Sequence, residues 1–106
     1  MSNSAKLEVQ ALARKIATQE IDPILGCRAI VGKLRYLDEH VIKHEAFLTI
    51  RAIESETDDL PVGPERDSWD RFALAEKDRE LTEYLAKVAQ AFNEACLEIS
   101  EGRPWP

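Results

Sequence analysis

The sequence has no long apolar run and no excess of positive charge, and these absences exclude several functions. No stretch approaches the roughly 20 consecutive apolar residues that a membrane-spanning helix requires. Lysine and arginine together number 14, against 20 aspartates and glutamates, so the formal net charge is −6. Because sequence-independent binding to DNA or RNA depends on a basic surface, we expect neither a nucleic-acid nor a membrane partner. Segment 1–10 lacks the apolar core of a signal peptide, and we therefore expect a cytoplasmic protein.

Cysteine is also scarce, and no catalytic or metal-binding motif is complete. Cys27 and Cys96 both fall at apolar helical positions, which favours reduced thiols in a core over a disulfide. His40 and His44 are four residues apart, but zinc needs three or four protein ligands and no cysteine lies nearby. No serine has the G-x-S-x-G context of a hydrolase nucleophile. The leading interpretation therefore has no catalytic residue, no metal and no cofactor.

Strand patterns are missing as well, whereas apolar residues recur with helical spacing along most of the chain. The predicted helices are residues 4–20, 23–37, 41–54 and 74–100, with a loop at 55–73 and a tail at 102–106. This pattern predicts an all-α fold, namely a small four-helix bundle-like single domain spanning residues 1–106. A structured acidic loop precedes its long C-terminal helix.

Glycine and proline are few, and each has a specific place in the pattern. Asp22 and Pro23 suit the N-cap and the first position of the second helix. Gly26 and Gly32 lie inside that helix, where each costs about 1 kcal/mol relative to alanine. We interpret both as points where another helix approaches closely. Gly102 suits the position that follows the last helix.

The most unusual segment is AIESETDDLPVGPERDSWDRF, residues 52–72. Between residues 51 and 71 there are seven acids and three bases, so −4 of the net charge of −6 lies in this fifth of the chain. We expect Arg66 to pair with Asp58 or Asp59, which would hold the loop together. Trp69 and Phe72, three residues apart, are expected to fold the loop back onto the bundle.

The charge pattern suggests a non-enzymatic protein-interaction domain that binds a basic partner, as an immunity or antitoxin-like protein covers a basic toxin. The candidate partner-binding residues are Glu54, Glu56, Asp58, Asp59, Arg66, Trp69 and Trp105. Trp105 stands between two prolines at the C-terminus, and packing on its own chain is favoured over a role as an interface anchor.

Two alternatives remain open on the sequence. The first is a metal- or small-ligand-binding protein or enzyme that uses the carboxylates of residues 54–59 with Arg51 or Arg66, because Mg²⁺ and Ca²⁺ take oxygen ligands. The stretch DDLPVGPERD, however, lacks the D-x-D-x-D-G register of a calcium loop. The second alternative is a structural subunit whose apolar helix faces complete a homodimer.

Three motifs together resemble a group of small bacterial proteins of unknown function. They are A-R-x-I at residues 13–16, G-C-R at residues 26–28, and S-E-T-D-x-L-P-x-G-x-x-R-x-x-W at residues 55–69. The similarity covers residues 11 to about 100, most of the chain. The resemblance implies a bacterial cytoplasmic origin and one small helical domain, and it carries no activity.

Overall fold

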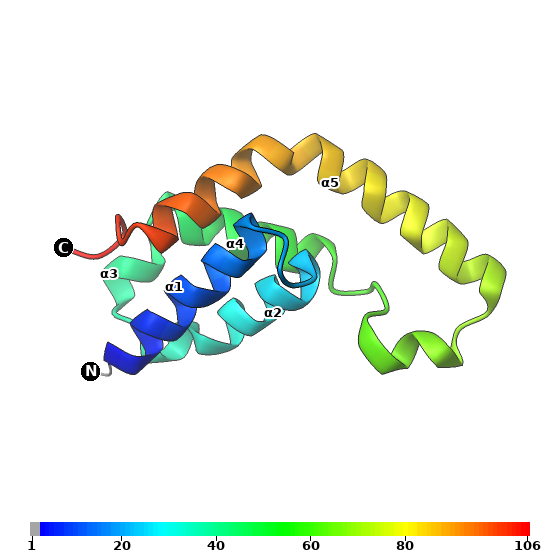
Figure 1. Cartoon of the computed structure of the whole chain (residues 1–106), viewed down its shortest axis with the longest axis horizontal. Coiled ribbons are helices and arrows are strands. Elements are labelled where there is room, and N and C mark those ends of the chain that lie inside the picture. Colours follow the sequence, from blue (N-terminus) through cyan, green and yellow to red (C-terminus); the bar gives the residue numbers. More distant parts are fainter. Residues whose placement is uncertain (1–2) are drawn as a thin grey trace.

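In this all-α fold, shown as a computed structural model in Figure 1, two helices pack directly against one end of a much longer helix, and a third packs mainly on those two. The structure describes residues 3–106, and among them there is no strand. The elements are α1 (Asn3–Ala17), α2 (Pro23–Lys33), the 3₁₀-helix η1 (Leu34–Tyr36), α3 (Glu39–Ile42), α4 (Glu45–Glu56), the 3₁₀-helix η2 (Gly63–Ser68) and α5 (Arg71–Ser100). The all-α prediction is confirmed, and α1, α2, α4 and α5 are the four predicted helices.

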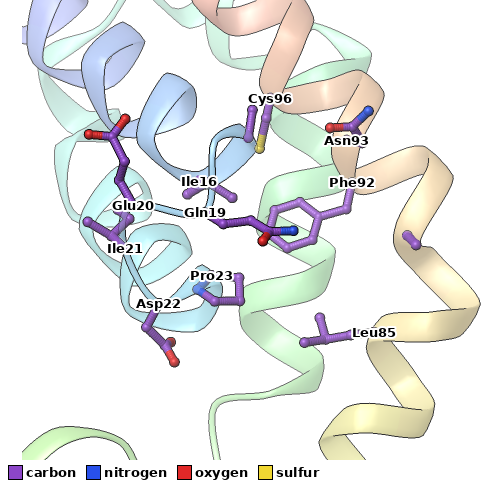
Figure 2. A pocket seen from close by; sticks show the side chains of 12 residues that line it. Ile16, Gln19, Glu20, Ile21, Asp22, Pro23, Leu85, Phe92, Asn93 and Cys96 are labelled. Atoms are coloured by element: carbon purple, nitrogen blue, oxygen red, sulfur yellow. The ribbon is translucent and has the colours of Figure 1, made fainter.

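The connector between α1 and α2 is organised by backbone and side-chain caps (Figure 2). The Asp22 carboxylate accepts hydrogen bonds from the backbone N–H groups of Ile24 and Leu25 at 2.9 and 3.0 Å. Asp22 is therefore the N-cap of α2, with Pro23 at its first position, as the sequence predicts. At the end of α1, Gln19 has a φ of 63°, in the left-handed region that usually holds glycine.

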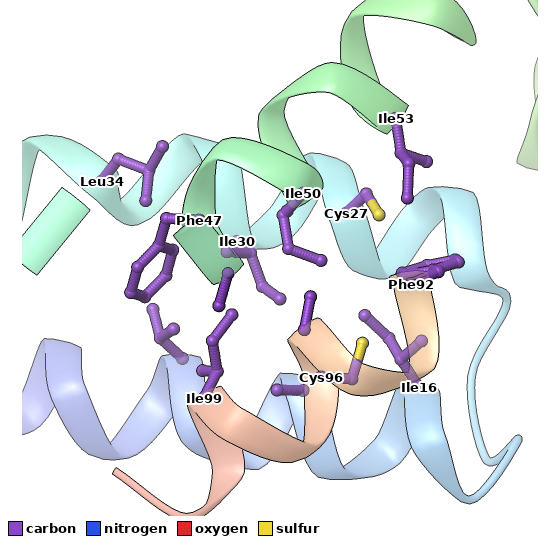
Figure 3. Close-up of a cluster of buried hydrophobic side chains, with 14 of the residues drawn as sticks. Ile16, Cys27, Ile30, Leu34, Phe47, Ile50, Ile53, Phe92, Cys96 and Ile99 are labelled. Atoms are coloured by element: carbon purple, nitrogen blue, oxygen red, sulfur yellow. The ribbon is translucent and has the colours of Figure 1, made fainter. Parts of the chain in front are cut away.

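The core lies where α1, α2 and α4 meet the second half of α5 (Figure 3). Its large, fully buried side chains are Val9, Ile24, Ile30, Val41, Phe47, Ile50, Ile53 and Ile99. Cys27 and Cys96 are buried in the same cluster as free thiols, so the prediction of reduced core cysteines is confirmed. The pKa of both thiols is raised from 9.0 to about 12, and burial is the largest cause in each case.

Helix α5 is about twice as long as the helices that pack against it, so they cover only part of its length. With a rise of 1.5 Å per residue, its 30 residues extend about 45 Å, whereas the 15 residues of α1 extend about 22 Å. Phe92, Ala95 and Ile99 are buried, but Leu81 and Leu85 earlier on the same stripe are only half-buried. The first half of α5 and the segment leading to it therefore extend away from α1 and α2 (Figure 1).

The predicted helix at residues 41–54 was wrong in its extent. The chain forms the short helix α3 and then α4, with a break at residues 43 and 44. His44 caps α4, because its Nδ1 accepts the backbone N–H of Ala46 at 3.0 Å. His44 therefore has a local structural role as the N-cap of α4.

The two glycines of α2 have opposite surroundings. A Cβ at Gly26 would lie 2.5 Å from Cγ1 of Ile16, so close approach by α1 is confirmed there. A Cβ at Gly32 would meet nothing within 4 Å, and the same prediction was wrong for Gly32. Gly102 follows α5 with a φ of 79°, as predicted.

Within residues 3–106, no helix combines the length and the hydropathy that a bilayer crossing demands.

Candidate functional site

The candidate site begins at the C-terminal end of α4, where Arg28 of α2 fixes the backbone. The Arg28 Nη2 donates to the carbonyl oxygens of Thr57 at 3.0 Å and Leu60 at 2.9 Å. The Thr57 hydroxyl is buried and donates to the carbonyl of Ile53 at 2.7 Å. A guanidinium at this place satisfies carbonyls that a helix end leaves without partners and opposes the negative end of the helix dipole. The segment that follows α4 is therefore held in a defined course.

Three acids lie in the last turn of α4 or just after it, and we call Glu54, Glu56 and Asp58 the acidic surface. Glu54 and Asp58 are four residues apart, whereas Glu56 lies on another flank of the helix. Glu54 is half-buried, whereas Glu56 and Asp58 are exposed. Among residues 3–106, their carboxylates have no ion-pair or hydrogen-bond partner. The last turn of α4 also carries no basic residue. Negative charge at a helix C-terminus is unfavourable, by about 0.3–1 kcal/mol for an exposed group. The helix dipole therefore disfavours the acidic surface, and the Arg28 guanidinium at the same helix end offsets part of this effect.

Arg66 does not pair with Asp58 or Asp59, and that prediction was wrong. Its two terminal nitrogens donate to both oxygens of Asp78 on α5, at 2.9 and 2.8 Å. This hydrogen bond is the main cause that lowers the pKa of Asp78. Arg66 therefore ties η2 to α5 instead of clamping the loop on itself.

Asp59 is also engaged, because Lys77 of α5 donates to its carboxylate at 3.3 Å. That hydrogen bond is the first cause that raises the pKa of Lys77, followed by the charge of Glu80. Glu65 accepts the backbone N–H of Val62 at 2.8 Å, and Asp70 caps α5 by accepting two N–H groups at 3.1 Å. Asp59, Glu65 and Asp70 therefore stabilise the loop, and in this role they differ from the residues of the acidic surface.

The aromatic candidates have different places. The Trp105 ring packs edge-on against Phe47, with centroids 5.7 Å apart and planes at 84°. The Lys6 ammonium lies 5.4 Å from the Trp105 ring centroid, so the predicted packing of Trp105 on its own chain is confirmed. Trp69 is half-buried at the end of η2, whereas Phe72 is 81% exposed. The prediction that Phe72 folds the loop back was wrong.

The candidate residues thus separate into groups instead of forming one constellation. Glu54, Glu56 and Asp58 share one helix end, Asp59 and Arg66 bind α5, and Trp105 packs near the start of α1. Among residues 3–106, no three Asp, Glu, His or Cys side chains are arranged to hold a metal ion.

Arg28, Lys77 and Asp78 are the residues that sequence reasoning missed. Arg28 is the one arginine in the apolar sequence PILGCRAIVGK of α2, and a charge among apolar residues is a usable signal for a capping or pairing role. Asp78 lies 12 residues from Arg66, and no short-range spacing rule connects them. Their pairing follows only from the course of the chain.

Comparison with known protein families, curated proteins and solved structures found no match. The resemblance of residues 11–100 to small bacterial proteins of unknown function therefore stays a prediction.

Proposed function

We propose that this chain is a non-enzymatic interaction protein that binds a basic protein partner through the acidic surface at the end of α4. Its specific form is an immunity or antitoxin-like protein that covers the basic site of a toxin in the bacterial cytoplasm. The observation that carries the proposal is the position of Glu54, Glu56 and Asp58. They are unpaired acids at a helix end whose dipole opposes them.

Violations of local stability rules tend to occur at functional positions, where a binding requirement outweighs a small loss of stability. Asp59, Glu65 and Asp70 of the same segment do not violate such rules, whereas the exposed Asp67 has no partner among residues 3–106. Asp70 stands at a helix N-terminus, where negative charge is favourable, and Asp59 has an ion-pair partner. This distinction supports a binding role for Glu54, Glu56 and Asp58 and a structural role for Asp59, Glu65 and Asp70.

The backbone beneath the acidic surface is fixed before any partner arrives. Arg28 bridges the end of α4 to Leu60, and Leu60 itself is buried. A surface that is already ordered loses less conformational entropy on binding, which favours affinity. Exposed carboxylates on such a surface mainly speed association and select a basic partner, and their effect weakens as salt rises.

The test is affinity capture from a lysate of the source organism at low salt, read by mass spectrometry. The variant Glu54→Gln/Glu56→Gln/Asp58→Asn removes three negative charges from the acidic surface. The matched control is Glu45→Gln/Glu94→Gln/Glu98→Gln, which removes three charges from residues that lie together between α4 and α5 elsewhere on the molecule. We expect one basic protein to be retained by the wild type and by the control, and to be lost by the acidic-surface variant.

Equal retention by all three proteins would contradict the proposal. Equal loss with both variants would also contradict it, because net charge and not the acidic surface would then explain the binding. The purified pair should show an affinity that falls steeply between about 50 and 300 mM salt. Tight binding that ignores salt would exclude an electrostatic docking surface.

A further inference from the structure

A groove of about 720 Å³ lies between the α1–α2 connector and α5 (Figure 2). The core side chains Ile16, Phe92 and Cys96 form its floor. Leu85 and Ala89 of α5 form one wall, in which Leu85 is half-buried and Ala89 is exposed, so a bound molecule could cover apolar surface there. Ligand pockets typically have volumes of about 300–1,000 Å³ and mostly apolar linings. The groove therefore has the size and the lining of a site for a small molecule.

The interior of the groove carries no charge. Glu20 and Asp22 are the charged residues of its lining, and both carboxylates are already engaged. Glu20 accepts the Thr18 hydroxyl at 2.6 Å, and Asp22 caps α2 through bonds of 2.9 and 3.0 Å. Figure 2 shows both carboxylates directed away from the space that faces α5. An ion would lose hydration on entering this space without gaining a charged partner, so the groove favours a neutral occupant.

Two amides supply the polar groups of this uncharged space. Gln19 and Asn93 both line the groove, and their side-chain amides have no hydrogen-bond partner within residues 3–106. In Figure 2 the Gln19 side chain extends from the connector toward the Phe92 ring. A primary amide both donates and accepts, so it can bind an amide or a hydroxyl group of a ligand. A few polar groups beside an apolar floor are the usual means by which a pocket orients its ligand.

Gln19 occupies a backbone position that suits glycine better. The ends of α1 and α5 share one hydrogen-bonding pattern, in which Gly102 has the left-handed conformation after α5 and Gln19 has it after α1. Glycine adopts this conformation freely, whereas a residue with a side chain is strained there. No hydrogen bond of the Gln19 side chain within residues 3–106 offsets this strain. Strained residues are concentrated at binding sites, and the amide of Gln19 is what glycine would not supply.

The rings in the lining favour an aromatic ligand. Phe92 contributes its ring from α5, and Pro23 contributes a ring from the start of α2. Figure 2 shows both rings in the space between the connector and α5. Aromatic pairs in offset or edge-on geometry gain energy beyond the area that they bury. A flat, rigid ligand also loses less conformational freedom on binding than a flexible chain does.

We propose that the groove binds a small neutral aromatic molecule whose amide or hydroxyl group is held by Gln19 and Asn93. The aromatic body of the ligand lies against Leu85, Ala89 and Phe92. This site goes beyond the proposed function and does not depend on it, because no residue of the acidic surface lines the groove.

Three probes of the same size test the preference for a neutral ligand. Benzamide is neutral, benzoate is an anion and benzylamine is a cation at neutral pH. Nuclear magnetic resonance titration of the isotope-labelled protein, up to about 10 mM probe, measures each affinity from the chemical-shift changes. We expect benzamide to bind at least about threefold more tightly than either charged probe. Its binding should shift the side-chain amide signals of Gln19 and Asn93.

Three variants locate the binding. Gln19→Gly removes the amide at a position that suits glycine, so its melting temperature should equal or exceed that of the wild type. Ala89→Trp places a large ring in the groove, and Ala75→Trp places the same ring on α5 outside it; both alanines are exposed. Circular dichroism and thermal melting check the fold of each variant. We expect Gln19→Gly and Ala89→Trp each to weaken benzamide at least about threefold, and Ala75→Trp to leave its affinity unchanged.

Several outcomes would overturn the proposal. One is the absence of saturable shifts with benzamide up to about 10 mM, and another is equal affinity for the three probes, which apolar contact alone would explain. Equal affinity of the wild type and Ala89→Trp would place the binding outside the groove. If Ala89→Trp does not fold, Gln19→Gly decides, because unchanged benzamide affinity in that variant would exclude the amide as a ligand contact. None of these results bears on the acidic surface, which capture of a basic partner tests separately.

Discussion

At the scale of single residues, the two glycines of α2 show that identical residues in one helix can have opposite energetic roles. We predict that Gly32→Ala stabilises the protein by up to about 1 kcal/mol, because Gly32 is exposed and alanine is the better helix former. Gly26→Ala should destabilise by about 1–3 kcal/mol, because its Cβ would collide with buried Ile16. Urea unfolding of both variants measures the two changes. A similar change of free energy in both would show that α1 does not approach α2 as described.

The two buried thiols connect stability to pH. Burial raises the pKa of Cys27 and Cys96 to about 12, whereas the thiols of the unfolded chain ionise near 9.0. Between these values the unfolded chain binds fewer protons, so stability falls as pH rises, by about 1 kcal/mol per pH unit and per thiol. Below pH 9 this contribution is fully present.

We therefore predict that the stability difference between the wild type and Cys27→Ala/Cys96→Ala shrinks as pH rises from about 8 to 10. Taking the difference removes the contribution of lysines that titrate in the same range. Urea unfolding at several pH values provides the measurement. A difference that stays constant with pH would mean that the thiols are ionised to the same extent in the folded and unfolded chains.

At the scale of elements, Arg28 joins α2 to the end of α4. We predict that Arg28→Ala destabilises the protein by about 1.5–3 kcal/mol, because it removes a charged donor from the carbonyls of Thr57 and Leu60. Arg28→Lys should recover part of the loss, since an ammonium also donates but cannot reproduce the planar geometry. Arg14→Ala, at an exposed position of α1, is the control and should change stability by less than about 0.5 kcal/mol. Thermal and urea unfolding compare the three, and equal effects at both arginines would rule out the capping role.

The four long helices could be predicted from the sequence, whereas α3, η2 and several helix boundaries could not. The apolar periods of α1, α2, α4 and α5 identified those helices because burial imposes the period directly. The break before α4 escaped prediction because histidine is an unusual N-cap, and His44 acts as one through Nδ1. The start of α5 was placed three residues late because Asp70 is one of several acids there that could cap a helix.

At the scale of the whole molecule, the sequence predicted the acidic surface but not the partners of its neighbours. Charge concentration is local, so the excess of acids at residues 51–71 is visible without a structure. Arg66 and Asp59 contact α5 because the chain turns back after η2 and places α5 beside them. Sequence spacing alone does not show this arrangement. The sequence also could not show which part of α5 the other helices cover, because its apolar stripe is continuous along the helix.

This uneven coverage gives the first half of α5 a lower local stability than the second. We predict that amides of residues 75–84 exchange with deuterium faster than those of residues 92–99, which lie against the core. Asp78→Asn should accelerate exchange in the first half only, because it breaks the ion pair with Arg66 of η2. Glu83→Gln is the matched control, since it breaks an ion pair with Arg79 that lies wholly on α5 and ties it to no other element. Hydrogen exchange followed by mass spectrometry compares the two, and equal acceleration by both variants would show that the contact between η2 and α5 does not hold the helix in place.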